Sequence, residues 1–143
     1  MPLINVTAPK GILQKKQVAD LMNRISEAVL EAEGAPVDYA GARALTWAYY
    51  REAAKDEIFI GGQNIDQPPL LIEVTTPEGA LNTEREVSLV AAIGVIVDDI
   101  LGHYEGALNQ WTLLREVKDG NWSGSGQIFP LAGIQAAMNI KVA

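Results

Sequence analysis

The sequence of 143 residues contains no cysteine and a single histidine, His103. The absence of cysteine excludes disulfides, thiolate zinc sites and cysteine nucleophiles. Positive charge is also scarce: the sequence has 11 Lys and Arg residues and 18 Asp and Glu residues, which gives a net charge of −7. This balance disfavours nonspecific binding to nucleic acid or to an anionic membrane, so we expect neither as a partner. An anionic substrate would have to meet a local cation.

Long apolar runs are missing as well. The most apolar stretch of the second half is interrupted by Asp98 and Asp99, so no membrane span is predicted. No basic and apolar leader is present, which favours a cytoplasmic location. With 48% hydrophobic residues the chain can still fill one core, and we expect a single domain over residues 1–143.

The sequence contains an internal repeat of eleven residues. Residues 3–13 (LINVTAPKGIL) return 68 positions later as residues 71–81 (LIEVTTPEGAL), with seven of the eleven positions identical. The first copy is preceded by Pro2 and the second by Leu70. The sequence therefore predicts a duplicated unit, with repeats at about 2–62 and 70–130, in which one copy alone carries a proline behind Met1.

Each copy has the pattern of a strand, a helix and a second strand. In the first copy we expect a strand over 3–8, a helix with an apolar stripe from Val18 to Ala32, a strand over 42–51 and a short hairpin strand, Ile58–Ile60, before Gly61-Gly62. In the second copy we expect a strand over 70–75, a helix starting at a capping box over 83–86, a strand over 109–116 and a hairpin over 122–129. Gly34 and Gly102, 68 residues apart, are predicted to end the two helices in register.

These elements predict an α+β fold, a two-layer α/β sandwich. Right-handed crossovers place both helices of the duplicated β-α-β units on one face of a four-stranded mixed sheet, and short hairpins are expected in addition. The strands are apolar enough that the uncovered face is expected to be buried by further copies of the chain. We therefore expect a homo-oligomer.

Several motifs resemble the tautomerase superfamily, which is built from β-α-β units with a catalytic N-terminal proline. Pro2-Leu3-Ile4, residues 24–29 with Gly34-Ala35-Pro36, and Phe59-Ile60-Gly61-Gly62 resemble 4-oxalocrotonate tautomerase. The full length, with residues 47–62 and 78–111, resembles the duplicated cis-3-chloroacrylic acid dehalogenase group. The resemblance covers most of the chain and implies a homotrimer, because three duplicated chains supply the six units that single-unit relatives assemble as hexamers.

The resemblance implies chemistry by the amine of Pro2, without cofactor or metal. Once Met1 is removed, Pro2 has a free ring nitrogen whose pKa is lowered by burial in an apolar pocket. Such an amine can act as general base and shuttle a proton in an enolisable or unsaturated carbonyl substrate, which is 1,3-keto–enol tautomerisation. It can also act as a nucleophile towards aldehydes or ketones. While Met1 remains, the same nitrogen is an amide and does neither.

Other residues depart from the family pattern. Ile12, Pro77 and Ala80 stand where relatives have arginines that bind a carboxylate. The histidine, tyrosine and glutamate of the dehalogenase correspond to Val29, Leu113 and Gly124. The resemblance therefore implies a more apolar pocket and argues against dehalogenation of cis-3-chloroacrylate.

Replacement partners must come from the polar and aromatic residues that remain. Arg43, expected on one strand face with Trp47 and Tyr49, and Arg115 are the candidates to stabilise an oxyanion. Candidate substrate-binding residues are Trp47, Tyr49, Leu113, Glu116 and Trp122. Simpler roles remain open: a solvated charge for Arg43, a surface ion pair for Arg115 with Glu116, and core or interface packing for the aromatic residues.

Three hypotheses follow for a small-molecule carbonyl substrate. The first is a cofactor-independent tautomerase, or isomerase, that uses Pro2. The second is Pro2-dependent hydration, decarboxylation or carbon–carbon bond chemistry. The third is a catalytically silent trimeric binding protein on the same scaffold. The intact mass, which shows whether Met1 is present, and the titration of the Pro2 amine discriminate the third from the others.

Overall fold

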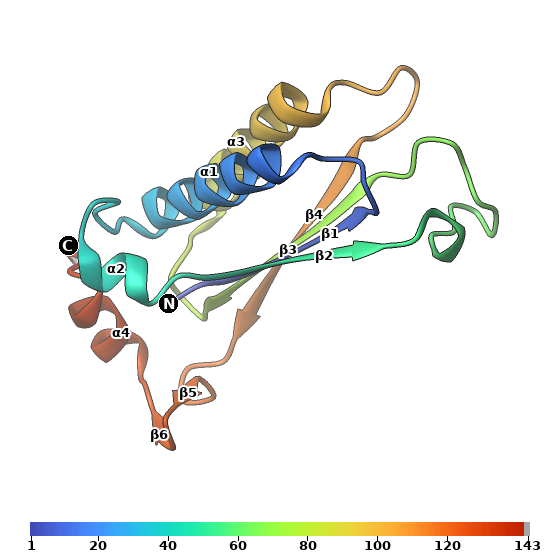
Figure 1. Ribbon diagram of the computed structural model, residues 1–143. Helices are drawn as coiled ribbons and strands as arrows, with labels where there is room; N and C mark the ends of the chain where they lie inside the picture. Colours follow the sequence, from blue (N-terminus) through green and yellow to red (C-terminus); the bar gives the residue numbers. More distant parts are fainter. Residues whose placement is uncertain (142–143) are drawn as a thin grey trace.

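The structure is a computed structural model and describes residues 1–141. Its centre is a four-stranded sheet in the order β2-β1-β3-β4, with β1 at Leu3–Pro9, β2 at Trp47–Ala53, β3 at Leu70–Pro77 and β4 at Gln110–Val117. The pairs β1–β2 and β3–β4 are parallel, and β1–β3 is antiparallel. Helices α1 (Lys15–Glu33) and α3 (Thr83–Leu101) lie side by side on one face of the sheet (Figure 1). The predicted α+β sandwich with a mixed sheet is confirmed.

The two long helices follow the duplication closely. Each has 19 residues, and their bounds lie 68 residues apart. Gly34 ends α1 at a φ of +77°, a left-handed conformation that glycine adopts without steric cost. At the start of α3, the N-cap is Asn82, whose side chain accepts a hydrogen bond from the backbone of Arg85. The predicted capping box is therefore one residue late, because the amide of Asn82 caps as well as a hydroxyl does.

The core lies between the sheet and these two helices. Alternate strand residues point into it, and the helices contribute residues at helical spacing. The buried residues of this core include Ile4, Val6, Ala8, Leu21, Ile25, Val29, Ile72, Val74, Leu89, Ile93 and Val97. Both copies contribute to this one core, so they form a common packing unit.

The predicted strand over 42–51 is wrong at its start. Residues Ala40–Ala44 form a short helix, α2, and the strand begins only at Trp47. Three alanines in this segment favour a helix, and the aromatic residues that favour a strand start at Trp47. The Thr46 hydroxyl donates to the carbonyl of Ala42, 2.9 Å away, at the end of this helix. Arg43 therefore lies on α2 and not on a strand face with Trp47 and Tyr49.

The two hairpins differ in extent. The predicted strand Ile58–Ile60 is absent: Lys55–Glu57 is a short 3-10 helix, η1, and Ile60 makes a single bridge with Gln63 around Gly61-Gly62. The second hairpin is present as β5 (Ser123–Gly124) and β6 (Gln127–Ile128), which pair antiparallel. Its turn is made possible by Gly126, which has a φ of +80°.

A second, smaller core closes one end of the molecule. Helix α4 (Leu131–Ala137), which the sequence reasoning did not predict, packs beside α2 near the N-terminus (Figure 1). Ile134 and Met138 are buried there with Leu30, Ala35 and Ala42. The C-terminal segment therefore folds back onto the end of the sheet where the chain starts.

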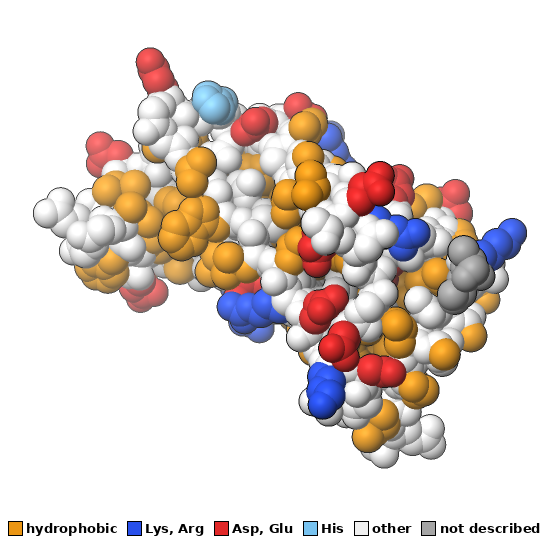
Figure 2. All heavy atoms as spheres, turned by 180° about the vertical axis from the view of Figure 1, so that it is seen from behind, with side chains coloured by type: hydrophobic (Ala, Val, Ile, Leu, Met, Phe, Trp, Pro, Cys, Tyr) orange, Lys and Arg blue, Asp and Glu red, His pale blue; other side chains and the backbone are white. Residues whose placement is uncertain are grey.

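The face of the sheet opposite the helices is uncovered. Trp47 and Tyr49 on β2, and Trp111 and Leu113 on β4, are all exposed, the two tryptophans by more than 60%. Apolar side chains also form exposed patches on the side of the molecule seen in Figure 2. Within residues 1–141 no helix is long and apolar enough to cross a membrane.

Candidate active site

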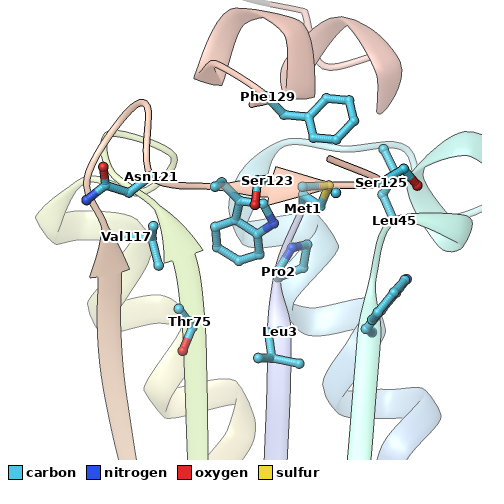
Figure 3. A pocket seen from close by; sticks show the side chains of 13 residues that line it. Met1, Pro2, Leu3, Leu45, Thr75, Val117, Asn121, Ser123, Ser125 and Phe129 are labelled. Carbon is cyan, nitrogen blue, oxygen red and sulfur yellow. The ribbon is translucent and has the colours of Figure 1, made fainter. Parts of the chain in front are cut away.

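A cavity of about 560 Å³ surrounds the start of β1. In Figure 3, Met1, Pro2 and Leu3 follow one another through its centre, with Thr75 and Val117 on one side and Leu45 on the other. The remaining lining residues come from β2 and the 121–129 segment: Trp47, Asn121, Trp122, Ser123, Gly124, Ser125 and Phe129. The cavity is therefore built from both copies, with the second hairpin above the N-terminal proline.

Pro2 is held in place by the sheet. Its carbonyl accepts a hydrogen bond from the backbone N–H of Trp47, 3.1 Å away, which continues the parallel pairing of β1 and β2 beyond Leu3. The proline is buried, and its ring is part of the cavity wall. A proline at this position costs no ladder hydrogen bond on its own nitrogen, because the strand starts after it.

The N-terminal amino group of Met1 lies beside a buried acid. It is 3.6 Å from Oε2 of Glu33 and 2.8 Å from Sδ of Met138. Burial lowers the pKa of this amino group, and the charge of Glu33 partly opposes the shift. Burial likewise raises the pKa of Glu33, against the opposing effect of the amino group. Both shifts have the same cause, because a low-dielectric environment disfavours each charged form.

The cavity lining is uncharged apart from the N-terminus. Its polar side chains are Thr75, Asn121, Ser123 and Ser125, with the indole N–H groups of the two tryptophans. Among residues 1–141, no Lys, Arg, His, Asp or Glu side chain lines it. The arrangement can donate hydrogen bonds to a carbonyl oxygen from hydroxyl and amide groups, but it offers no side-chain cation to a carboxylate.

The second hairpin forms the upper wall of the cavity, and α4 follows it directly in the chain. The backbone N–H of Phe129 donates to the carbonyl of Trp122 across the hairpin, at 2.9 Å. Asp119 accepts a hydrogen bond from the backbone N–H of Leu131, also at 2.9 Å, and so joins the end of β4 to the start of α4. These contacts fix Trp122 and Phe129 over Pro2, and Phe129 stands above the cavity in Figure 3.

Of the predicted substrate-binding residues, Trp47 and Trp122 line the cavity and the others do not. Arg43 is also elsewhere: its guanidinium is 2.8 Å from the Glu27 carboxylate and also donates to Asn23 and to the carbonyl of Val37. The hydrogen bond from Arg43 holds the pKa of Glu27 below its usual value. Arg43 therefore joins α2 to α1, a structural contact that the sequence reasoning did not anticipate.

Arg115, Tyr49 and Leu113 lie on the uncovered face of the sheet. Arg115 faces Thr75 in the strand register and pairs with Glu73, 2.9 Å away. Glu116 has a different place: its carboxylate accepts a hydrogen bond from the backbone N–H of Gly79, at 3.3 Å. Within one chain these residues are not brought together with Pro2.

A second repeated motif, at the start of the second strand of each copy, was not predicted from the sequence. The pattern Trp-x-x-x-Arg-Glu occurs at 47–52 and at 111–116. Glu52 accepts from the backbone N–H of Gly11 at 2.8 Å, as Glu116 does from Gly79, so each copy ties the loop after its first strand to its second strand. The offset is 64 residues rather than 68, because the segment between the helix and this tryptophan is four residues shorter in the second copy. A comparison that allowed this gap would have found it.

Comparison with known proteins supports the fold through structure rather than sequence. No protein-family model matches the chain, and no curated protein matches it by sequence. One chain from the symmetric trimer of wild-type fused 4-OT superposes on this chain with a TM-score of 0.71 at 22% identity, over 94% of this chain and 98% of that one.

Two further structures are similar over comparable lengths. Pt0534 inactivated by 2-oxo-3-pentynoate gives a TM-score of 0.72 at 24% identity, over 88% of this chain and 94% of that one. N1, a member of the cis-3-chloroacrylic acid dehalogenase family, gives a TM-score of 0.75 at 16% identity, over 94% of this chain and 87% of that one. The chain therefore has the fold of the tautomerase superfamily.

Proposed function

We propose that the chain is a cofactor-independent enzyme in which Pro2, once Met1 is removed, acts as general base on an enolisable or unsaturated carbonyl substrate. The observation that carries the proposal is the place of Pro2, buried at the centre of a cavity of about 560 Å³ that the second hairpin covers. Proteins of the same fold include members of tautomerase and dehalogenase families.

The surroundings of the N-terminus favour a neutral amine. Burial lowers the pKa of the Met1 amino group, one residue from Pro2. The same apolar walls would act on the Pro2 amine after removal of Met1, since Leu3, Leu45 and Trp122 line the one cavity that holds both residues. A neutral amine can take a proton from the carbon next to a carbonyl and return it to the other end of the enol.

Hydrogen-bond donors are available for the developing oxyanion. The hydroxyls of Thr75, Ser123 and Ser125 and the amide of Asn121 line the same cavity. Neutral donors stabilise an enolate less than an arginine does, since hydrogen bonds to charged groups are the stronger ones. We therefore expect slow turnover and a preference for apolar carbonyl compounds over carboxylates.

We also propose that the chain forms a homotrimer through the uncovered sheet face. Solved structures of fused 4-OT with the same fold are trimers. Trp111 and Leu113 expose apolar surface there, and a partner would remove that surface from water. In such an assembly Arg115 and Tyr49 become candidates to reach the cavity of a neighbouring copy.

A catalytically silent binding protein on the same fold is the second candidate. It is favoured by the uncharged side-chain lining of the cavity among residues 1–141. Such a protein would bind an apolar ligand without turning it over.

The deciding experiment is a screen of enolisable and unsaturated carbonyl compounds, arylpyruvates included, with protein whose intact mass shows Pro2 as the first residue. Pro2→Ala should reduce kcat/KM for any turned-over compound by about 10²–10⁴-fold, the usual contribution of a general base. Ser125→Ala, which removes one of several donors, should have a smaller effect. Equal rates for Pro2→Ala and the unchanged protein would refute the mechanism.

A further inference from the structure

Glu33 is a buried acid that the proposed mechanism does not use. It is 2% exposed, and within residues 1–141 neither of its carboxylate oxygens accepts a hydrogen bond. The last residue of α1 is an unfavourable place for a negative charge, because the carboxyl end of a helix dipole is itself negative. A carboxylate that is buried without hydrogen bonds at this end of a helix requires a nearby cation to remain charged.

The cation in this structure is the amino group of Met1. It lies 3.6 Å from Oε2 of Glu33, and no Lys, Arg or His of the described residues contributes to the pKa shift of Glu33. Met1 also lines the cavity and packs against the small core that contains Met138 and Leu30. Met1 thus places a primary ammonium group, attached to a short apolar side chain, next to the Glu33 carboxylate.

Removal of Met1 takes this partner away while Pro2 stays on the sheet. The Pro2 carbonyl is held by the N–H of Trp47, so its nitrogen is fixed at the start of β1. Consecutive backbone nitrogens are roughly 3–4 Å apart, so the position of the Met1 ammonium is next to the Pro2 nitrogen.

We propose that Glu33 forms an acidic subsite beside Pro2 in the processed chain, which binds a protonated amino group of the substrate. The proposal rests on the proposed function and narrows its substrate class to amino-substituted carbonyl compounds. The short distance between the two nitrogen positions favours substrates whose amino group is one to three bonds from the carbon that loses its proton. An ammonium bound there would also favour the neutral form of the Pro2 amine, because like charges repel.

The test measures binding without turnover. Propylammonium chloride is titrated into the processed chain, and backbone amide signals around residues 30–35 are followed by NMR, with propanol and propionate as the neutral and anionic probes. We expect saturable shifts with propylammonium and none with propionate. Glu33→Gln should weaken binding about tenfold or more, the usual effect of losing a charged hydrogen bond in a buried site.

Two controls isolate the subsite. Glu31→Gln removes an exposed carboxylate two residues earlier on the same helix and should leave binding unchanged. The chain that retains Met1 should not bind propylammonium, because its own amino group occupies the position; this comparison requires no substitution and so stands even if Glu33→Gln fails to fold.

Absence of propylammonium binding by the processed chain, or equal binding by the chain that retains Met1, would overturn the subsite. Equal binding by a folded Glu33→Gln variant would do the same. Turnover measurements separate the proposed subsite from the proposed role of Pro2 as general base. Glu33→Gln should lower kcat/KM for an α-amino ketone but not for the analogue without the amino group. Pro2→Ala should lower kcat/KM for both compounds. A Pro2→Ala variant that loses neither activity would count against the general mechanism alone.

Discussion

The resemblance to the tautomerase superfamily implies that Pro77, Ala80 and Gly124 stand where relatives have carboxylate-binding arginines and a water-activating glutamate, which bears on the reactions expected at the Pro2 cavity. Hydration of cis-3-chloroacrylate requires a bound carboxylate and an activated water. Pro77 and Ala80 cannot bind the carboxylate, and Gly124, which lines the cavity, cannot activate water. The absence of a general base alone reduces such rates by about 10²–10⁴-fold. We expect no more than trace halide release from cis-3-chloroacrylate by the processed chain, measured with a halide assay; efficient release would show that other residues have rebuilt the site.

Glu33 should also give the stability of the Met1-retaining chain a distinct pH dependence. Its pKa in the folded state is raised above the ordinary value of 4.5, mainly by burial. The folded chain therefore binds the proton more tightly than the unfolded chain, and the stabilisation present below pH 4.5 is lost as pH rises through the folded-state pKa. Glu33→Gln removes this titration.

The corresponding measurement compares the thermal unfolding midpoints of the Met1-retaining chain and of its Glu33→Gln variant between about pH 4 and pH 8. The midpoint of Glu33→Gln relative to the unchanged protein should rise as pH increases above about 4.5. A difference that does not vary with pH would show that Glu33 is not the titrating group. The exposed Glu31→Gln substitution is the matched control.

At the scale of elements, the loops that follow β1 and β3 are held by equivalent hydrogen bonds. Glu52 accepts from Gly11 at 2.8 Å, and Glu116 accepts from Gly79 at 3.3 Å. Both glycines have positive φ, +76° and +84°, so these turns depend on them.

Removal of either carboxylate should loosen its turn. Because both hydrogen bonds are exposed, we expect Glu52→Ala to lower the free energy of unfolding by about 1 kcal/mol and Glu116→Ala by less, since its hydrogen bond is longer. Urea denaturation measures both, with Glu52→Gln and Glu116→Gln expected to retain most of the stability. A larger loss for Glu116→Ala than for Glu52→Ala would contradict this ranking.

The elements also show what could be predicted from the sequence. The repeat and the apolar patterns predicted β1, α1, β3, α3 and β4 close to their observed bounds, because strand alternation and helical spacing recur in both copies. They placed the start of β2 too early and added a strand over Ile58–Ile60 that is absent. Helix α2 was missed because Arg43 and Leu45 continue the alternation of Trp47 and Tyr49, which predicted a strand from residue 42. Helix α4 was missed because it has no counterpart in the first copy. The cavity could not be predicted beyond Pro2, Trp47 and Trp122, since its wall joins residues from positions 1 and 129, which are brought together only by tertiary packing.

At the scale of the whole molecule, the uncovered sheet face should be the interface of the proposed trimer. Leu113→Lys places a charge on this face, where Glu73 lies opposite in the register and can pair with it in a single chain. Burial of the added charge between copies is unfavourable, so association should weaken by about tenfold or more. Native mass spectrometry at micromolar concentration should show trimers for the unchanged chain and smaller species for Leu113→Lys.

Val95→Lys is the matched control, because Val95 is equally apolar and 60% exposed but lies on α3, on the opposite side of the sheet. It should remain trimeric. A stable monomer of the unchanged chain, or loss of trimers only in Val95→Lys, would place the interface elsewhere.

The junction between the two copies determines how many terminal amines one chain has at the ends of its equivalent strands. Leu70 is the counterpart of Pro2, and its N–H donates to the carbonyl of Asn109, 2.9 Å away. In that copy the nitrogen is therefore committed to a peptide bond and a ladder hydrogen bond, so covalent fusion of the copies leaves one terminal amine for two equivalent strand ends. An inactivator that binds in the cavity and reacts with the terminal amine should accordingly reach full effect at one equivalent per chain, and a trimer would hold three such centres rather than six.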